Sequence, residues 1–313
     1  MPPRLLFDIM SEARESRSAT LDCLIVGGGP AGLTAAVYLA RFHRNVVLAD
    51  CGTSRARYIP RSHNCPGFAS GIRGKDLLAN LRRQARQFGA RIINRRVTSI
   101  VKRPDGFEVR LGHFRRHTRA LLVATGIEDI LPRVAGIESA IFRGVVRLCP
   151  ICDGYEASTR RIAVYGPPEN VIGHARFLRS YSRQVSAVLS KGGSLSAADR
   201  AVVKELQIDV VPWPNQLVVG RRSCRVRSLG VDLVFDCLYP CLGFKPKSLL
   251  SAALGARVDR RGELVVNAHM QTTIPGLYGA GDAIASLHQI SVATGHAAIA
   301  ATAIHNWLGS NPE

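Results

Sequence analysis

Long hydrophobic runs are missing from this sequence. No stretch approaches the roughly 20 apolar residues that a membrane-spanning helix needs. The first residues, MPPRLLFDIMSEARESRSATLD, mix charges of both signs and lack the apolar core of a signal peptide. We therefore expect a cytoplasmic protein with no membrane partner. Cysteines in that compartment are normally reduced, so a close cysteine pair is more often catalytic or metal-binding than structural.

Acidic residues are scarce as well. The chain has 23 Asp and Glu against 42 Lys and Arg, of which 36 are arginine, and its formal net charge is +19. Nucleic-acid binding is one interpretation of this balance. However, no basic motif interleaved with aromatic residues and no helix-turn-helix spacing accompanies it. We expect a general arginine-rich composition with no nucleic-acid partner, whose field attracts acidic partners.

The order of elements indicates two α/β domains. A chain of 313 residues with 46% hydrophobic content is longer than one average domain and can bury a sizeable core. The patterns predict a helix over 71–90, a hairpin over 97–112 and an apolar strand over 120–126. A strand, helix, strand rhythm begins again at residue 160, and a long helix rich in small residues follows 288. The middle of the chain therefore resembles a second dinucleotide-type domain inserted into the first.

A glycine-rich turn lies between an apolar strand and a helix near the start. Its spacing is Gly27-x-Gly29-x-x-Gly32, and Pro30 suits the first turn of the helix. Such glycines allow the tight turn, the approach of a pyrophosphate and close helix packing, and the helix N-terminus supplies amide donors. Asp50 ends the next strand, where it can accept from a ribose hydroxyl. A turn built only for packing would explain the glycines but not the acid, so the pattern predicts dinucleotide binding.

Two of the eight cysteines stand close together in CPICDGYE, residues 149–156. This pair could be a disulfide staple, half of a zinc site or a redox centre. Zinc needs four ligands, and the nearest second pair, Cys237 and Cys241, lies in an apolar strand-like run where buried thiols are expected. We predict no metal. Cys149 and Cys152 have the spacing of a dithiol that closes reversibly, and Asp153 is placed either to move its proton or to cap a helix.

Five blocks of the sequence carry a resemblance to a known family: GGGPAGL (27–33), HNCPGF (63–68), VATG (123–126), CPICDGYE (149–156) and IPGLYGAGDA through HQISVATG (274–295). In this order they resemble the low-molecular-weight thioredoxin reductases. The resemblance implies an α/β fold of two Rossmann-like three-layer domains, the central one inserted into a discontinuous FAD-binding domain. It places an N-terminal extension at 1–20, the FAD-binding domain at 21–126 and 243–313, and the central, dithiol-carrying domain at 127–242.

The resemblance also implies the roles of single residues. Cys152 would face the flavin, Cys149 would attack the disulfide of a partner, and Asp153 would donate and accept the proton. The residues implied to hold FAD are Gly27, Gly29, Pro30, Ala31, Gly32 and Asp50 at the ADP half, Asn64, Ala124, Thr125 and Gly126 along the isoalloxazine, Gly281 and Asp282 near the ribityl and phosphate portion, and His288, Gln289 and Ile290 at the ring. The partner would be a thioredoxin-like or other disulfide or dithiol substrate, and the protein a homodimer.

The central domain departs from the family at its own glycine turn. In GPPENV (166–171), Gly166 is kept, but Pro168 replaces the second glycine and Val171 the last small residue. Proline lacks an amide hydrogen, so this turn should bind a dinucleotide poorly in the usual pose. The arginines expected to hold a ribose 2′-phosphate are also absent, since LSKGGSL offers only Lys191. His288 stands where an arginine usually precedes Gln289, and it could tune the flavin or be a neutral surface residue.

These departures resemble a branch in which the NADPH motif is degenerate: diflavin-linked disulfide oxidoreductases, ferredoxin-type flavin thioredoxin reductases and dithiol oxidases. The sequence predicts an FAD-dependent thiol-disulfide oxidoreductase and leaves NADPH use open. The central pocket could instead hold a second flavin. Two alternatives remain: a conventional NADPH-dependent thioredoxin reductase with an unusual turn, and a flavin-containing redox sensor or binding protein without turnover.

Overall fold

The structure, a computed structural model, describes residues 20–309, in which the chain forms two compact units. The first unit runs to Ser54, resumes over Asn80–Gly126 and is completed from Pro246 onward. The second unit comprises Arg55–Ala79 and Ile127–Lys245. The predicted fold class is confirmed: both units are α/β, and the second is inserted into the first. The predicted extension at 1–20 lies, except for its last residue, outside the described residues.

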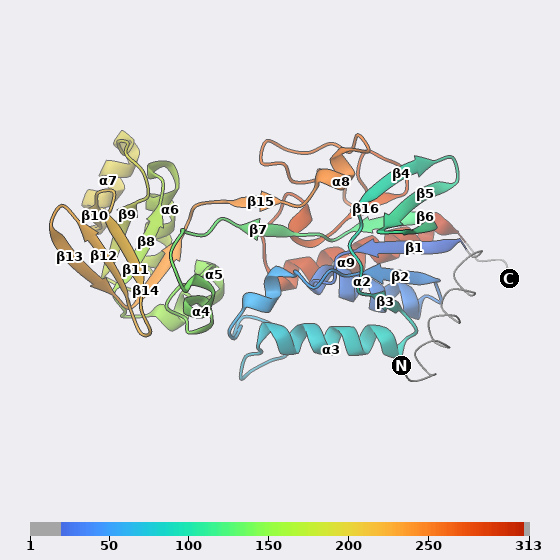
Figure 1. Cartoon of the computed structure of the whole chain (residues 1–313), viewed down its shortest axis with the longest axis horizontal. Coiled ribbons are helices and arrows are strands. Elements are labelled where there is room, and N and C mark those ends of the chain that lie inside the picture. The colour runs from blue at the N-terminus through green and yellow to red at the C-terminus, as the bar shows by residue number, and fades with distance from the viewer. Residues whose placement is uncertain (1–19, 310–313) are drawn as a thin grey trace. The chain divides into compact units, whose positions relative to one another are not determined.

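Over the described residues, the first unit forms a seven-stranded sheet (Figure 1) with the order β3-β2-β1-β6-β5-β4, in which β16 also pairs with β6. The strands β1, β2, β3, β6 and β16 are parallel, whereas β4, β5 and β6 form an antiparallel meander. Their bounds are β1 Leu21–Val26, β2 Val46–Ala49, β3 Arg91–Ile93, β4 Ser99–Arg103, β5 Gly106–Leu111, β6 Phe114–Val123 and β16 Leu277–Gly279.

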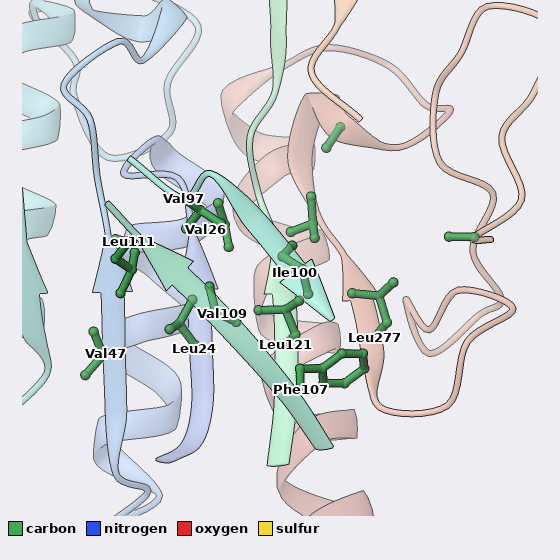
Figure 2. Packing of buried hydrophobic residues seen from close by; sticks show 14 of the residues in the cluster. Leu24, Val26, Val47, Val97, Ile100, Phe107, Val109, Leu111, Leu121 and Leu277 are labelled. Atoms are coloured by element: carbon green, nitrogen blue, oxygen red, sulfur yellow. The ribbon is translucent and has the colours of Figure 1, made fainter. Parts of the chain in front are cut away.

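Helices and an apolar cluster cover this sheet. Small residues let α2 (Pro30–Arg41) and α9 (Ile290–Leu308) pack on each other, since alanine and glycine make up most of the residues that each helix buries. In Figure 2, buried side chains from β1, β2, β4, β5, β6 and β16 gather into one cluster, which includes Leu24, Phe107 and Leu121. Full burial of each such side chain contributes about 1.5–3 kcal/mol. The shorter elements are α8 (Leu249–Ala252) and η3 (Gly281–Ala283), and α3 (Gly74–Gln87) is divided between the units.

Three layers also build the second unit. Its parallel sheet has the order β10-β9-β8-β14, and a separate antiparallel sheet has the order β11-β12-β13. Alternation along β8 explains the layers, because Ile162 and Val164 join the cluster under the helices, whereas Ala163 joins the cluster of the antiparallel sheet. The bounds are β8 Ile162–Gly166, β9 Val185–Leu189, β10 Asp209–Val211, β11 Gln216–Val219, β12 Cys224–Ser228, β13 Val231–Phe235, β14 Cys237–Pro240, α4 Ile137–Phe142, α5 Pro150–Asp153, η2 Tyr155–Ala157, α6 Pro168–Leu178 and α7 Ala197–Leu206.

The segment 55–79 belongs to the second unit, whereas the sequence placed it in the FAD-binding domain. Arg55, at the start of η1 (Arg55–Tyr58), forms an ion pair with Asp129 at 2.6 Å, and Tyr58 donates to Glu138 at 2.9 Å. These side-chain contacts have no local sequence pattern. The chain passes from the first unit to the second through β7 (Ile127–Asp129) and back through β15 (Phe244–Pro246), which pair with each other.

Candidate active site

The glycine turn after β1 has the geometry of a dinucleotide-binding turn. Gly27 has φ +114°, a conformation that side chains rarely adopt. A Cβ at Gly32 would lie 1.9 Å from the Gly27 carbonyl oxygen, so only glycine lets α2 start this close to β1. A Cβ at Gly29 would meet only Ser54 Oγ, at 3.3 Å. The rest of the first unit therefore leaves the backbone at Gly29 accessible to a ligand, and the turn fits the ADP half of FAD.

Asp50 lies against this turn, at the end of β2. Its side chain is buried, with 6% of the residue exposed, and a Cβ at Gly28 would lie 2.2 Å from its carboxyl carbon. Gly28 is thus a required glycine that the predicted spacing missed, because the pattern counts only positions 27, 29 and 32. The Asp50 carboxylate accepts from the Gly52 amide at 2.8 Å and forms an ion pair with Arg82. Arg82 could not be predicted, since it comes from α3.

The remaining predicted flavin residues of the first unit meet the turn at one edge of the sheet. The strands β1, β2, β6 and β16 are parallel, so their carboxyl ends lie at the same edge. A Cβ at Gly281 would lie 2.8 Å from Ala31, and a Cβ at Gly126 would lie 4.0 Å from Asp282. The residues that follow these strands, or begin the helices there, are Gly27, Gly29, Pro30, Ala31, Gly32, Asp50, Ala124, Thr125, Gly126, Gly281, Asp282, Gln289 and Ile290.

His288 has a specific buried partner. Its Nε2 lies 2.7 Å from Oε1 of Glu263, a residue that is 1% exposed, while the other carboxylate oxygen of Glu263 bonds to Arg261 at 3.0 Å. His288 is therefore not a free surface side chain. This pairing brings a buried carboxylate and a histidine next to Gln289, the residue before α9.

The dithiol lies in the second unit as a disulfide between Cys149 and Cys152, with their Cα atoms 5.2 Å apart. Cys149 is the N-cap of α5, and its Sγ accepts from the Cys152 amide at 3.2 Å. Ile151, between the cysteines, is exposed, and Tyr155 is 80% exposed. A disulfide that closes so short a loop constrains the chain little, which favours a redox centre over a staple.

Asp153 directly follows Cys152 and sits in a network of buried partners. Its Oδ1 accepts from the Tyr239 hydroxyl at 2.9 Å, and its Oδ2 pairs with Arg147 at 3.2 Å. Burial raises the pKa of Asp153, although Arg147 and Tyr239 both lower it. The cap of α5 is Cys149, so the Asp153 carboxyl does not serve as that cap. Arg147 and Tyr239 are functional candidates that the sequence did not indicate, since Tyr239 lies 86 residues away in β14.

Asn64 lies beside the dithiol segment of the second unit. Its Nδ2 donates to the Ile151 carbonyl at 3.4 Å, and its Oδ1 accepts from Ser62 at 2.9 Å. The sequence had placed Asn64 along the isoalloxazine. Its observed contact connects it to Ile151, one of the two residues between the cysteines.

Cys237 and Cys241, the nearest second cysteine pair, are buried, unreactive thiols. Burial raises the pKa of Cys237 to about 11 and of Cys241 to about 12, so both stay protonated near neutral pH. Among the described residues, no group of three or more His, Cys, Asp or Glu side chains could hold a metal ion.

The second glycine turn differs from the first in its packing and in the residues that start its helix. A Cβ at Gly166 would lie 2.2 Å from Cys241 Sγ, so packing alone explains this glycine. Pro167 is the N-cap of α6 and Pro168 its first residue, so neither supplies an amide hydrogen, and Glu169 is an acidic residue of the first turn. Lys191 bonds to Glu169 at 2.8 Å and, together with the Glu169 amide, lowers the pKa of that carboxyl. An anion at this helix start would compete with Glu169 for the same charges.

Two dinucleotide-type folds, one with an open glycine turn and one with a close cysteine pair, define the class of two-domain disulfide oxidoreductases. The chain belongs to the pyridine nucleotide-disulphide oxidoreductase family, whose model matches residues 21–297. Within it the chain groups with the low-molecular-weight thioredoxin reductases and is a flavin-dependent disulfide oxidoreductase. No helix in the described part of the chain is long and apolar enough to cross a membrane.

Individual relatives cover nearly the whole chain. The thioredoxin reductase of Listeria innocua is 30% identical over 302 residues, which are 91% of this chain and 93% of that protein. The crystal structure of HlmI superposes with a TM-score of 0.85 at 27% identity and covers 94% of both chains. The thioredoxin reductase of Giardia duodenalis gives a TM-score of 0.82 at 25% identity, with 94% of this chain and 100% of that chain covered.

Proposed function

We propose that this protein is an FAD-dependent thiol-disulfide oxidoreductase that does not depend on NADPH as its electron donor. It exchanges electrons between FAD in the first unit and the Cys149–Cys152 pair, and then between this pair and a thioredoxin-like or other disulfide or dithiol partner. The observation that carries the proposal is the contrast between the two glycine turns. The turn at Gly27–Gly32 has room for a ligand, whereas the helix after Gly166 starts with two prolines that lack amide hydrogens and with Glu169, whose carboxylate pairs with Lys191.

FAD would be held by residues of the first unit. The amides after Gly27 and the start of α2 would bind its pyrophosphate, and Asp50 would accept from the ribose. When bound, FAD supplies the two-electron exchange with the cysteine pair. Asp282, Gln289 and Ile290 lie at the same edge of the sheet and would line the rest of the cofactor.

The dithiol would act through a mixed disulfide. The Cys149 thiolate attacks one sulfur of the partner's disulfide, so that a Cys149–partner bond forms and the partner's bond breaks. The released partner thiolate takes a proton from Asp153. Cys152 then gives its proton to Asp153 and attacks Cys149, which restores the intramolecular disulfide and releases the second partner thiolate. The reverse sequence oxidises a dithiol partner.

Several features of α6 speak against NADPH. Val171 is fully buried in the helix-sheet cluster, at the position where a small residue would allow closer packing. The amides of Asn170 and Val171 both bond to the Pro167 carbonyl at 3.0 Å, so neither points freely at a ligand. A Cβ at Gly193 would lie 3.2 Å from Pro168, which places the 190s loop against the turn. The same crowding argues against a second flavin held by its pyrophosphate.

A conventional NADPH-dependent thioredoxin reductase is the second candidate function. The 30% identity to the thioredoxin reductase of Listeria innocua favours it, because that relative spans nearly the whole chain. A thioredoxin-like partner and a homodimer would suit both candidates.

Trapping of the thiols tests the proposed exchange. The purified flavoprotein is reduced anaerobically with one two-electron equivalent of dithionite, quenched in acid, alkylated and mapped by mass spectrometry. We expect Cys149 and Cys152 to become alkylated while the flavin is reoxidised in proportion. Cys51, an exposed free thiol, serves as the internal reference because it reacts with or without reduction. Electrons that remain on the flavin while the disulfide stays closed would contradict the proposal.

A further inference from the structure

The side chains of Arg147 and Tyr239 each contact both the carboxylate and the main-chain carbonyl of Asp153. Arg147 Nη1 pairs with the Asp153 carboxylate at 3.2 Å and donates to the Asp153 carbonyl oxygen, also at 3.2 Å. The Tyr239 hydroxyl lies 2.9 Å from the carboxylate and 3.2 Å from the same carbonyl oxygen. Each partner therefore fixes both the main chain and the side chain of the residue that follows Cys152.

Arg147 and Tyr239 are both held by β14 and the backbone beside it, outside the short helix α5. Tyr239 is 1% exposed and lies in β14, a strand of the parallel sheet. The Arg147 amide donates to the Leu238 carbonyl at 2.9 Å, and its Nε donates to the Gly144 carbonyl at 3.1 Å. The Arg147 side chain is only 13% exposed. The Asp153 amide donates to the Cys149 carbonyl at 3.2 Å, which connects Asp153 and its two partners to the cysteine pair.

We propose that Arg147 and Tyr239 are positioning residues that hold the Asp153 carboxyl next to the dithiol and set the pH range over which it exchanges a proton with the thiols. The inference rests on the proposed function, in which Asp153 moves that proton. Neither residue touches the reacting sulfur atoms in this account. Both act through Asp153.

The groups around Asp153 explain the direction of the effect. Burial raises the pKa of Asp153, Arg147 and Tyr239 lower it, and Glu156 raises it by repulsion between like charges. Burial opposes the charge on Arg147, but the Asp153 carboxylate raises the pKa of that guanidinium, so it stays charged. Burial also raises the pKa of Tyr239, which therefore remains a neutral donor, and Cys237 is a protonated thiol near neutral pH. Arg147 is thus the main group that opposes burial.

Removing Arg147 should move the titration of Asp153 upward. In the step that protonates a leaving thiolate, the rate falls as pH rises through the pKa of Asp153, so a higher pKa carries this fall to higher pH. In the reverse step Asp153 must be ionised, and the rise in rate moves to higher pH as well. This fall or rise in rate is the limb of the pH–rate profile that Asp153 sets. We expect Arg147→Met to move the midpoint of the limb upward by about one to two pH units and Tyr239→Phe by less, since an ion pair changes a carboxyl pKa by about 1–3 units.

The test measures reduction of the Cys149–Cys152 disulfide of the holoprotein by excess dithiothreitol at a series of pH values. Rates are divided by the thiolate fraction of the reductant, which removes its own titration. Arg147→Lys keeps the charge and should restore most of the wild-type position of the limb. Arg227→Met removes an exposed ion pair with Asp232 elsewhere in the same unit and should leave the profile unchanged. Tyr239→Phe keeps the ring in place and serves if Arg147→Met does not fold.

Asp153→Asn separates failure of this inference from failure of the proposed function. If Asp153→Asn leaves the limb in place, Asp153 does not move the proton, and the proposed role fails together with the inference. If Asp153→Asn abolishes the limb but Arg147→Met and Tyr239→Phe leave it unmoved, only the inference is overturned. An upward shift in both variants, larger for Arg147→Met, supports it.

Discussion

Replacing Cys149 with serine is expected to lower the rate of disulfide exchange by about three orders of magnitude or more, because a hydroxyl cannot replace the attacking thiolate. Cys152→Ser should lower turnover to a similar extent for a different reason. Its Cys149 thiol can still attack, but no second thiol resolves the product. A mixed disulfide between Cys149 and a small disulfide probe should therefore accumulate in Cys152→Ser and be absent from Cys149→Ser.

Intact-mass spectrometry and steady-state rates measure these effects. Cys51→Ser is the matched control, since it removes an exposed free thiol outside the pair and should leave both the rate and the adduct pattern unchanged. The flavin content should stay near the wild-type value in Cys149→Ser and Cys152→Ser, because the cysteine pair belongs to the second unit. Wild-type turnover in Cys149→Ser would remove the dithiol from the mechanism and contradict the proposed function.

Gly32→Ala should strip the protein of flavin. The new Cβ would lie 1.9 Å from the Gly27 carbonyl oxygen and 3.3 Å from Ile25, of which Ile25 lies in β1 and Gly27 directly follows that strand. Backbone cannot yield as a flexible side chain does, so α2 must move away from β1. We expect about a tenth or less of the wild-type flavin affinity, since ~1.4 kcal/mol corresponds to a tenfold change. Such overpacking also lowers the free energy of unfolding by about 1–3 kcal/mol.

Gly173→Ala is the matched control for this substitution. Gly173 lies within α6, and a Cβ there meets no atom within 4 Å. The change should leave flavin content unaltered and stabilise the helix by about 0.5–1 kcal/mol, as alanine does in place of a helical glycine. Flavin absorbance per protein and thermal unfolding measure both variants. Full flavin content in Gly32→Ala would show that this turn does not hold the cofactor.

The regular elements could be predicted because their patterns are local. The turn at Gly27–Gly32 opens α2, the helix predicted over 71–90 contains α3, and the hairpin predicted over 97–112 contains β4 and β5. The strand predicted at 120–126 overlaps the end of the longer β6, which begins at Phe114 and stops at Val123. The first residues of β6 include arginines and a histidine. They are not buried, so this part of the strand lacks the apolar residues by which a strand is recognised in the sequence.

The partners that hold Asp153 beside the dithiol could not be predicted, because these contacts join residues far apart in the sequence. Cys149, Cys152 and Asp153 stand in one short motif, but Arg147 and Tyr239 become their neighbours only when β14 pairs with β8. The features that distinguish the second glycine turn could be predicted from the sequence only in part. Pro168 in the sequence already indicates that one amide donor is missing. The ion pair of Glu169 with Lys191 could not be predicted, because it forms only when the loop after β9 folds back toward α6.

The positions of domain boundaries depend on long-range packing as well. The chain was expected to leave the first domain after residue 126 and to return at 243, and the units change after Gly126 and at Pro246. The segment 55–79 joins the second unit through Arg55 and Tyr58, whose partners lie in β7 and α4. A motif such as HNCPGF marks a functional segment without revealing which unit holds it.

Anaerobic titration of the flavin absorbance with NADPH and, separately, with dithiothreitol tests the central claim most directly. The account predicts that dithiothreitol bleaches the flavin band through the Cys149–Cys152 pair, and that Cys152→Ser abolishes this bleaching. It also predicts that a stoichiometric amount of NADPH leaves the band in place, because two prolines remove amide donors at the start of α6 and the Glu169 carboxylate repels a pyrophosphate there. Rapid bleaching by stoichiometric NADPH would contradict the account and identify a conventional NADPH-dependent reductase.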